Sequence, residues 1–256
     1  MQYRMFLLCV FVLASVGVAK AAGSVDNTAF TALLRDHVKD GRVNYRAIKA
    51  DERFTQYIEI LKKTDPSALQ GNEKLAFWLN VYNAFTIKVI CDNYPLKSIT
   101  DLNGAGGLAI STVLKTTVWD KKLVEINGKQ YTLNGIENDI IRKMGDPRVH
   151  FAMVCAAKSC PPLRSEAFEP AKLNDQLEDQ GRDFLAQTKK NSFNIEKKTA
   201  AISNIFNWFQ ADFAKTVPDV LRYISRFLPK DKAEQVAANA AAFSVSYTEY
   251  DWSLNE

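Results

Sequence analysis

The sequence predicts an α+β fold: a mostly helical single domain around a small, largely antiparallel sheet, with a buried central helix. Three observations favour this class. Helical apolar periodicity recurs along most of the chain, short alternating segments occur as neighbours, and one long segment is apolar on all sides. A chain in which helices dominate and the few strands are adjacent in sequence is typical of the α+β class.

The first 21 of the 256 residues are predicted to be a secretory signal rather than part of the fold. Arg4 precedes an apolar run, Met5 to Val18, and a small-x-small end at Ala19 to Ala21 predicts cleavage before Ala22. We therefore expect a periplasmic or secreted protein whose residues 22–256 form one globular domain. Cys9 lies inside the apolar run and should be discarded with it.

Composition narrows the classes of partner. Of the 33 Lys and Arg residues, the signal removes Arg4 and Lys20, which leaves 31 basic against 29 acidic side chains. So small a net charge argues against nucleic acid as the main partner. No later stretch is both long and free of polar groups, so no transmembrane segment is expected after signal removal. A small molecule or peptide is the expected partner, and no cofactor is indicated.

The first predicted elements are helices. Apolar residues on one face predict a helix over Asn27 to Lys39, capped by Asn27, and a second helix over Asp51 to Lys63. From Leu75 to Ile90 the apolar residues surround the helix, which Pro95 ends, as expected of a helix buried on all sides.

That central helix carries three polar side chains, Asn80, Tyr82 and Asn83. A buried amide without a partner costs about 1–3 kcal/mol, so these groups must be bonded to something. Asn80 and Asn83 are three residues apart and should lie side by side.

The later elements follow from turn and cap signals. Asn127-Gly128 predicts a hairpin, and Asn134 is the expected cap of the next helix. The remaining predictions are a central strand over Arg148 to Ala156, a helix over Lys172 to Gln187, a hairpin over Phe193 to Ile202, a helix capped by Ser203, helices over Asp219 to Leu228 and Lys230 to Ala242, and a last strand near Phe243 to Trp252. Phe206, Trp208, Phe209, Phe213 and Cys91 are expected in the core.

The segment VHFAMVCAAKSCPPLR, Val149 to Arg164, concentrates the chemistry. On a regular strand His150 and Cys155 would point to opposite faces. A catalytic pair needs contact at about 3 Å, so either the strand bends at its end or His150 meets Cys160 instead. A Cys155–Cys160 disulfide needs Cα atoms within roughly 7 Å, hence a tight turn in CAAKSC, which its small residues and the following prolines suit. Such a short ring would stabilise the fold by roughly 2 kcal/mol.

Other sites are less well supported by the sequence. His150, Cys155 and Cys160 could supply three zinc ligands, but the only other histidine, His37, is distant and no C-x-x-C pair exists, so no metal site is predicted. The glycines of NGAGGL, Asn103 to Leu108, lack the phosphate-loop pattern and suggest a flexible loop.

Several separate motifs, in order, carry a family resemblance: LAFWLNVYNAFTIKVICDNYPLKSI, YTLNGIENDIIR, PRVHFAMVCAAKSCPPLR and the closing YDWSLN. Together they resemble the domain of unknown function 547 family, from about Phe30 to Asn255. The resemblance implies an uncharacterised single domain, often exported in bacteria. A histidine frequent in similar sequences is replaced here by Asn138, which weakens any site built from several histidines.

Two functions remain open. The favoured interpretation is a binding or scaffold domain with a structural Cys155–Cys160 disulfide. The alternative is a cysteine-dependent hydrolase or acyl transferase, with Cys155 as nucleophile, His150 as base and Glu137 orienting the histidine. The candidate ligand-binding residues are Asn80, Tyr82, Asn83 and Arg164; in the enzyme, Asn80 or Asn83 would also donate to an oxyanion.

Overall fold

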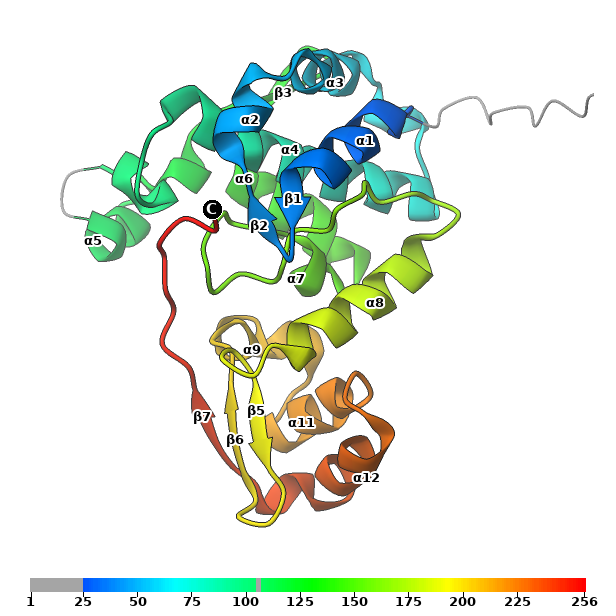
Figure 1. The fold of residues 1–256 in the computed structure, drawn as a ribbon, viewed down its shortest axis with the longest axis vertical. Helices are drawn as coiled ribbons and strands as arrows, with labels where there is room; N and C mark the ends of the chain where they lie inside the picture. The colour runs from blue at the N-terminus through cyan, green and yellow to red at the C-terminus, as the bar shows by residue number, and fades with distance from the viewer. Residues whose placement is uncertain (1–24, 105–106) are drawn as a thin grey trace, which may run out of the picture.

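The computed structural model describes residues 25–104 and 107–256, and these pack into two halves (Figure 1). The predicted signal over residues 1–21, Cys9 included, and residues 105–106 of the NGAGGL segment lie outside the described residues. The fold is α+β and mostly helical, as predicted. In the described part of the chain, no helix combines the length and hydropathy that crossing a bilayer requires.

The N-terminal half is the upper part of Figure 1. Its elements are α1 Thr28–His37, β1 Val38–Lys39, β2 Arg42–Val43, α2 Tyr45–Ala50, α3 Glu52–Lys63, η1 Pro66–Ala68, α4 Gly71–Asn93, η2 Ile99–Leu102, α5 Gly107–Val113, η3 Val118–Asp120, β3 Val124–Ile126, β4 Lys129–Tyr131, α6 Leu133–Gly135, η4 Ile136–Ile141, η5 Arg142–Met144 and α7 Val149–Ala152. All of these η elements are 3-10 helices except η4, which is a π-helix.

The C-terminal half lies below it and is joined to it by a long helix (Figure 1). Its elements are α8 Leu173–Ala186, β5 Ser192–Asn194, β6 Thr199–Ile202, α9 Ile205–Trp208, α10 Gln210–Phe213, α11 Val217–Ser225, α12 Lys230–Asn239, η6 Ala240–Ala242 and β7 Ser244–Tyr247. After β7 the chain returns to the upper half, where it ends.

The predicted central helix is confirmed as α4. Between Leu75 and Cys91 every residue is buried except Lys88, and α2, α3 and η4 contact the helix. The apolar pattern on all sides of this segment therefore follows from its central place in the first core.

Two hydrophobic cores meet at the junction of the halves, and two helices contribute residues to both. On α7, Val149 and Ala152 belong to the first core and Phe151 to the second. On α8, Leu177 belongs to the first core, while Phe184 belongs to the second. These two helices therefore tie the halves together.

The strands form three small sheets. β1 with β2, β3 with β4, and β5 with β6 are antiparallel pairs, while β7 adds to β6 in parallel. Both predicted hairpins are confirmed; Asn127 and Gly128 adopt φ values of 47° and 72°, as a two-residue turn between twisted strands requires.

The strand predicted over Arg148 to Ala156 is wrong. Val149–Ala152 is the single helical turn α7, and the extended residues after it bond to a side chain, since the Val154 N–H donates to Asn83 Oδ1 at 2.9 Å. A short run that is apolar on every side does not distinguish a strand from a buried helical turn.

Predicted helix starts also need correction. Thr132, not Asn134, caps α6 by accepting from the Gly135 N–H, and Asn134 instead donates to Asp120. Asn27 occupies the cap position of α1 without capping it, because its amide oxygen accepts from Tyr57. The helix predicted after Ser203 is interrupted at Phe209, which separates α9 from α10.

Candidate functional site

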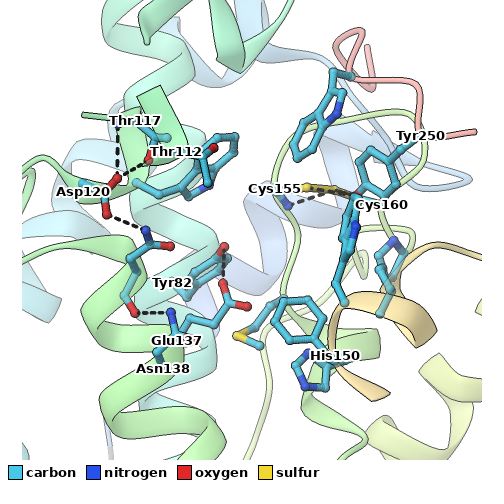
Figure 2. Close-up of a pocket in the computed structure, with 18 of the residues that line it drawn as sticks. Tyr82, Thr112, Thr117, Asp120, Glu137, Asn138, His150, Cys155, Cys160 and Tyr250 are labelled. Carbon is cyan, nitrogen blue, oxygen red and sulfur yellow. Dashed lines mark hydrogen bonds between the residues drawn. A yellow bond between two sulfur atoms is a disulfide. The ribbon is translucent and has the colours of Figure 1, made fainter. Parts of the chain in front are cut away.

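A cavity of about 600 Å³ opens at the junction of the two halves. Figure 2 shows Tyr82, Glu137 and Asn138 on one side of it, facing Cys155, Cys160 and Tyr250 on the other. Its aromatic lining consists of Tyr82, Trp119, Trp208, Phe209, Tyr250 and Trp252. We call this cavity the aromatic cleft. Concave, mostly apolar sites with a few polar groups are the usual form of small-molecule sites.

Three distant segments supply the aromatic wall. Trp252 of the C-terminal tail packs edge-on against Trp119 of η3 at 5.6 Å between ring centroids, and stacks with Trp208 of α9 at 6.1 Å. Tyr250 touches both Trp208 and Trp252, at 4.8 and 4.6 Å. Of these rings, Trp208 is 47% exposed, so a large apolar face is open to solvent or ligand.

The predicted aromatic core is confirmed in part. Phe206 and Phe213 are buried in the second core, Phe209 packs against that core and also lines the aromatic cleft, and Trp208 lines the cleft. All four follow the same helical pattern in the sequence, and a pattern of apolar residues does not separate a core face from the wall of a cleft. Cys91 is buried, as predicted.

Glu137 is the carboxyl group beside this wall. It projects from the π-helical turn η4, and Tyr82 of α4 donates its hydroxyl to Glu137 Oε2 at 3.2 Å. Burial of the carboxylate raises the pKa of Glu137 to about 7, and the negative charge of Asp212 acts in the same direction, while Tyr82 and Arg142 oppose the shift. Glu137 is therefore partly protonated near neutral pH.

His150 does not bond to Glu137, the orienting residue predicted for it. Its Nε2 lies 2.7 Å from Asp212 Oδ2 of α10, and its ring stacks on Phe209 at 4.2 Å. Arg142 completes the group by donating to both oxygens of Asp212, at 2.6 and 2.9 Å. Asp212 thus holds the imidazole in the place assigned to Glu137.

The imidazole of His150 is neutral at pH 7. Burial lowers the pKa of His150 to about 4, against the opposing effect of Asp212. The Arg142 guanidinium lowers the pKa of Asp212, which remains an ionised acceptor. Sequence reasoning missed Asp212, because its place on a helix 62 residues after His150 gives no local signal of the pairing.

Cys155 and Cys160 form a disulfide in the structure, with Cα atoms 6.2 Å apart. The turn between them contains Ala156 at φ 62°, and the Cys160 N–H donates to Ala157 O at 3.1 Å. The predicted sharp turn is therefore present, but it follows a helical turn and not a strand. The Tyr250 hydroxyl lies 3.2 Å from each sulfur.

The C-terminal tail fixes this turn from outside. The Lys158 N–H donates to Ser253 O at 2.8 Å, and the Asn255 N–H donates to Ala156 O at 3.1 Å. Tyr45 anchors the tail in turn by donating to Asn255 Oδ1 at 2.6 Å. The YDWSLN motif thus both supplies cleft rings and holds the disulfide turn.

The two buried asparagines act as backbone anchors. Asn83 bonds Ala152 O and the Val154 N–H, each at 2.9 Å. Asn80 does the same for Phe168, bonding its carbonyl and N–H at 2.9 Å each. With oxygen and nitrogen both engaged, and neither residue among those lining the cleft, Asn80 and Asn83 are not placed to bind a ligand there.

The two remaining ligand-binding candidates, Tyr82 and Arg164, lie in different depressions of the protein. Tyr82 reaches the aromatic cleft through its bond to Glu137. Arg164 lies in a separate depression, where it pairs with Glu166 at 2.9 Å and Asp179 at 2.7 Å. The structure thus unites Tyr82, Glu137, His150 and the cysteines, and leaves Arg164 apart.

A polar corner faces the rings. Both oxygens of Asp120 are used: Oδ2 accepts from Thr117, and Oδ1 accepts from Asn134 at 2.6 Å (Figure 2). Asn138 donates to Asn134 O at 2.9 Å and accepts from Arg142 at 2.6 Å. Among the described residues no three His, Cys, Asp or Glu side chains converge as a metal-binding set.

Comparison with known proteins gives one finding. Residues 66–185 match the family described as "Protein of unknown function, DUF547". This stretch contains α4, the Glu137 turn, α7 and the disulfide turn, but not the segments that carry Trp208, Asp212, Tyr250 and Trp252. No curated protein and no solved structure shows significant similarity to the chain.

Proposed function

We propose that the chain, whose residues 66–185 match the family described as "Protein of unknown function, DUF547", is an exported binding domain whose aromatic cleft holds a small organic ligand. The observation that carries the proposal is the cleft itself: about 600 Å³, lined by six aromatic side chains around one incompletely paired carboxyl group. Such a cavity matches the size and composition of small-molecule sites.

The disulfide supports binding over cysteine catalysis. A nucleophilic cysteine acts as a thiolate, whereas the sulfur of Cys155 is bonded to the sulfur of Cys160. The amides that an oxyanion would need, Asn80 and Asn83, are both engaged with backbone groups. The turn that carries the disulfide serves instead as a fixed wall of the cleft.

The state of these sulfurs can be measured directly. Alkylation of the unfolded protein without reductant, followed by mass spectrometry, should modify Cys91 alone, and prior reduction should add Cys155 and Cys160. If Cys155 is alkylated in the native protein without reductant, the hydrolase becomes the better account of this site.

Export is part of the proposal. The apolar run after Arg4 and the small residues Ala19 to Ala21 support it, and a disulfide is typical of oxidising compartments. The protein recovered from the periplasm or the medium should begin at Ala22. Recovery of the full-length chain in the cytoplasm would contradict export without affecting the binding proposal.

Ligand binding can be tested without knowing the ligand. A library of neutral, cationic and anionic small organic molecules is screened for increases in melting temperature, and each hit is repeated with Trp208→Ala. Since Trp208 lines the cleft and is 47% exposed, this variant should fold and lose the hits. The control Leu123→Ala removes an exposed apolar side chain outside the cleft and should keep them. Hits that are indifferent to Trp208, or an absence of hits, would count against a binding function.

A further inference from the structure

We infer that the ligand of the aromatic cleft is an organic cation, an ammonium compound whose charged group lies against the aromatic wall and pairs with Glu137. This inference rests on the proposed binding function and names its ligand class. Two independent features lead to it: the cluster of aromatic rings that lines the cleft, and the oxygen of Glu137 that has no bonded partner.

The aromatic rings that line the cleft form one continuous cluster. Trp208, Tyr250 and Trp252 contact one another at 4.6 to 6.1 Å, and Trp119 extends the cluster edge-on. A cation within about 6 Å of such a face is attracted by the ring quadrupole, most strongly for tryptophan, and several rings together form the usual aromatic cage for ammonium groups.

The polar side chains around Asp120 are already bonded to one another, whereas Glu137 has one oxygen without a bonded partner. Asp120, Thr117, Asn134 and Asn138 engage one another through the bonds described above. Glu137 receives only the Tyr82 hydroxyl, at Oε2, and its Oε1 has no hydrogen-bond donor among the residues that the structure describes. The cleft therefore offers a carboxylate oxygen that lacks a donor or a positive charge.

The charges of the lining favour a cation over an anion. Two carboxyl groups, Asp120 and Glu137, line the cleft, while its one lysine, Lys115, is exposed. His150 contributes no charge at neutral pH, because its pKa is lowered to about 4. An anion would meet Glu137 without a compensating donor, which would be unfavourable in a site walled by apolar rings.

The ionisation of Glu137 agrees with this geometry. Its raised pKa reflects a carboxylate that burial penalises, and the groups that act on it electrostatically or by hydrogen bonding are Tyr82, Arg142, Asp212 and Tyr250. Arg142 is the cation of this set, but both of its bonded partners are other residues, Asp212 and Asn138. A bound ammonium group would supply the positive charge that the carboxylate lacks.

The test uses a matched pair of probes on the mature, disulfide-bonded protein. Choline carries the quaternary ammonium, and 3,3-dimethylbutan-1-ol has the same shape with carbon in place of the charged nitrogen. Calorimetric and tryptophan-fluorescence titrations should show choline binding about tenfold or more tightly than the alcohol, as the cation–π range implies. Equal affinities, tighter binding of the alcohol, or no binding of choline would overturn the inference.

Variants then locate the charge. Glu137→Gln keeps the shape of the side chain and an acceptor for Tyr82, and should weaken choline about tenfold while leaving the alcohol unchanged. Glu249→Gln removes an exposed carboxyl outside the cleft and should change neither; thermal melts confirm that both variants fold. If Trp208-dependent library hits exist but are not cationic, the cation inference fails while the binding function stands.

Discussion

At the scale of single residues, Glu137 and His150 carry opposite responses to pH. The pKa of Glu137 is raised to about 7, so the folded state binds its proton more tightly than the unfolded chain does, and stability decreases as pH rises from about 4.5 to 7. The pKa of His150 is lowered to about 4, so stability decreases as pH falls from about 6.5 to 4. The two effects largely offset each other in the natural protein.

Glu137→Gln separates these two effects. Relative to the natural protein, the variant should be about equally stable at pH 4.5 and more stable at pH 8. The full shift in the pKa of Glu137 corresponds to a gain of about 3 kcal/mol in the free energy of unfolding, and the gain should be smaller because the side chain is partly open to the cleft. Urea unfolding at a series of pH values measures the difference. Glu249→Gln, at an exposed side chain, serves as the control. A Glu137→Gln difference that is the same at every pH would show that burial does not penalise the carboxylate.

The residues of the site could be predicted from the sequence, whereas most of the hydrogen bonds between them could not. Glu137, His150, Cys155, Cys160 and Tyr82 were predicted as site residues from the sequence, and the structure brings them to one cleft. The partner of His150 could not be predicted, because Asp212 reaches it only after the two halves pack. The buried asparagines were recognised as groups that need partners, and the structure supplies backbone groups for both.

At the scale of elements, predictions succeeded where the determining chemistry is local. The hairpin at Asn127-Gly128 depends on two residues that tolerate positive φ, which a sequence displays directly. The turn α7 was mistaken for a strand because packing on all sides, rather than a periodic pattern, decides its conformation. The π-helical turn that projects Glu137 into the cleft has no comparable signal in the sequence.

Two glycines in equivalent turns test how closely the disulfide turn is packed. Gly41 in the β1–β2 turn has φ 75°, and a Cβ there would lie 2.5 Å from Pro162 Cβ and 2.8 Å from its Cα. Gly128 in the β3–β4 turn has φ 72°, and a Cβ there would meet nothing within 4 Å. Pro162 lies two residues after Cys160, so the Gly41 contact reports on the position of the segment that follows the disulfide.

Gly128→Ala should cost only the strain of a positive φ, about 1–2 kcal/mol. Gly41→Ala pays the same strain and must also displace backbone at Pro162, which adds about 1–3 kcal/mol. Denaturant unfolding of both variants measures the two losses of stability. Because the strain of a positive φ is the same in both turns, the difference between the losses reports the contact with Pro162 alone. Equal losses of stability would mean that the segment after Cys160 moves aside freely.

At the scale of the whole molecule, the cleft exists because the chain passes between its halves twice, through α8 and through the returning tail. α7 and α8 contribute to both hydrophobic cores, and Tyr250 of the returning tail packs against both. A site built from η3, η4, α9 and the tail cannot be predicted from any one segment. Because two helices contribute to both cores, we expect the two halves to unfold together.

Cys91 provides a probe of that coupling. It is buried in α4 of the first core, and burial raises the pKa of its thiol to about 12, so a thiol reagent reaches it only when the first core opens. Leu221 lies on α11 in the second core and is fully buried. Leu221→Ala should lower stability by about 2–5 kcal/mol, and if the halves open as one unit, Cys91 labelling should accelerate at least about 30-fold.

Leu114→Ala, at a leucine that is 63% exposed, should leave the labelling rate unchanged. Unaltered labelling in Leu221→Ala, despite a destabilised C-terminal half, would show that the halves open independently and that the cleft can separate without unfolding of the first core.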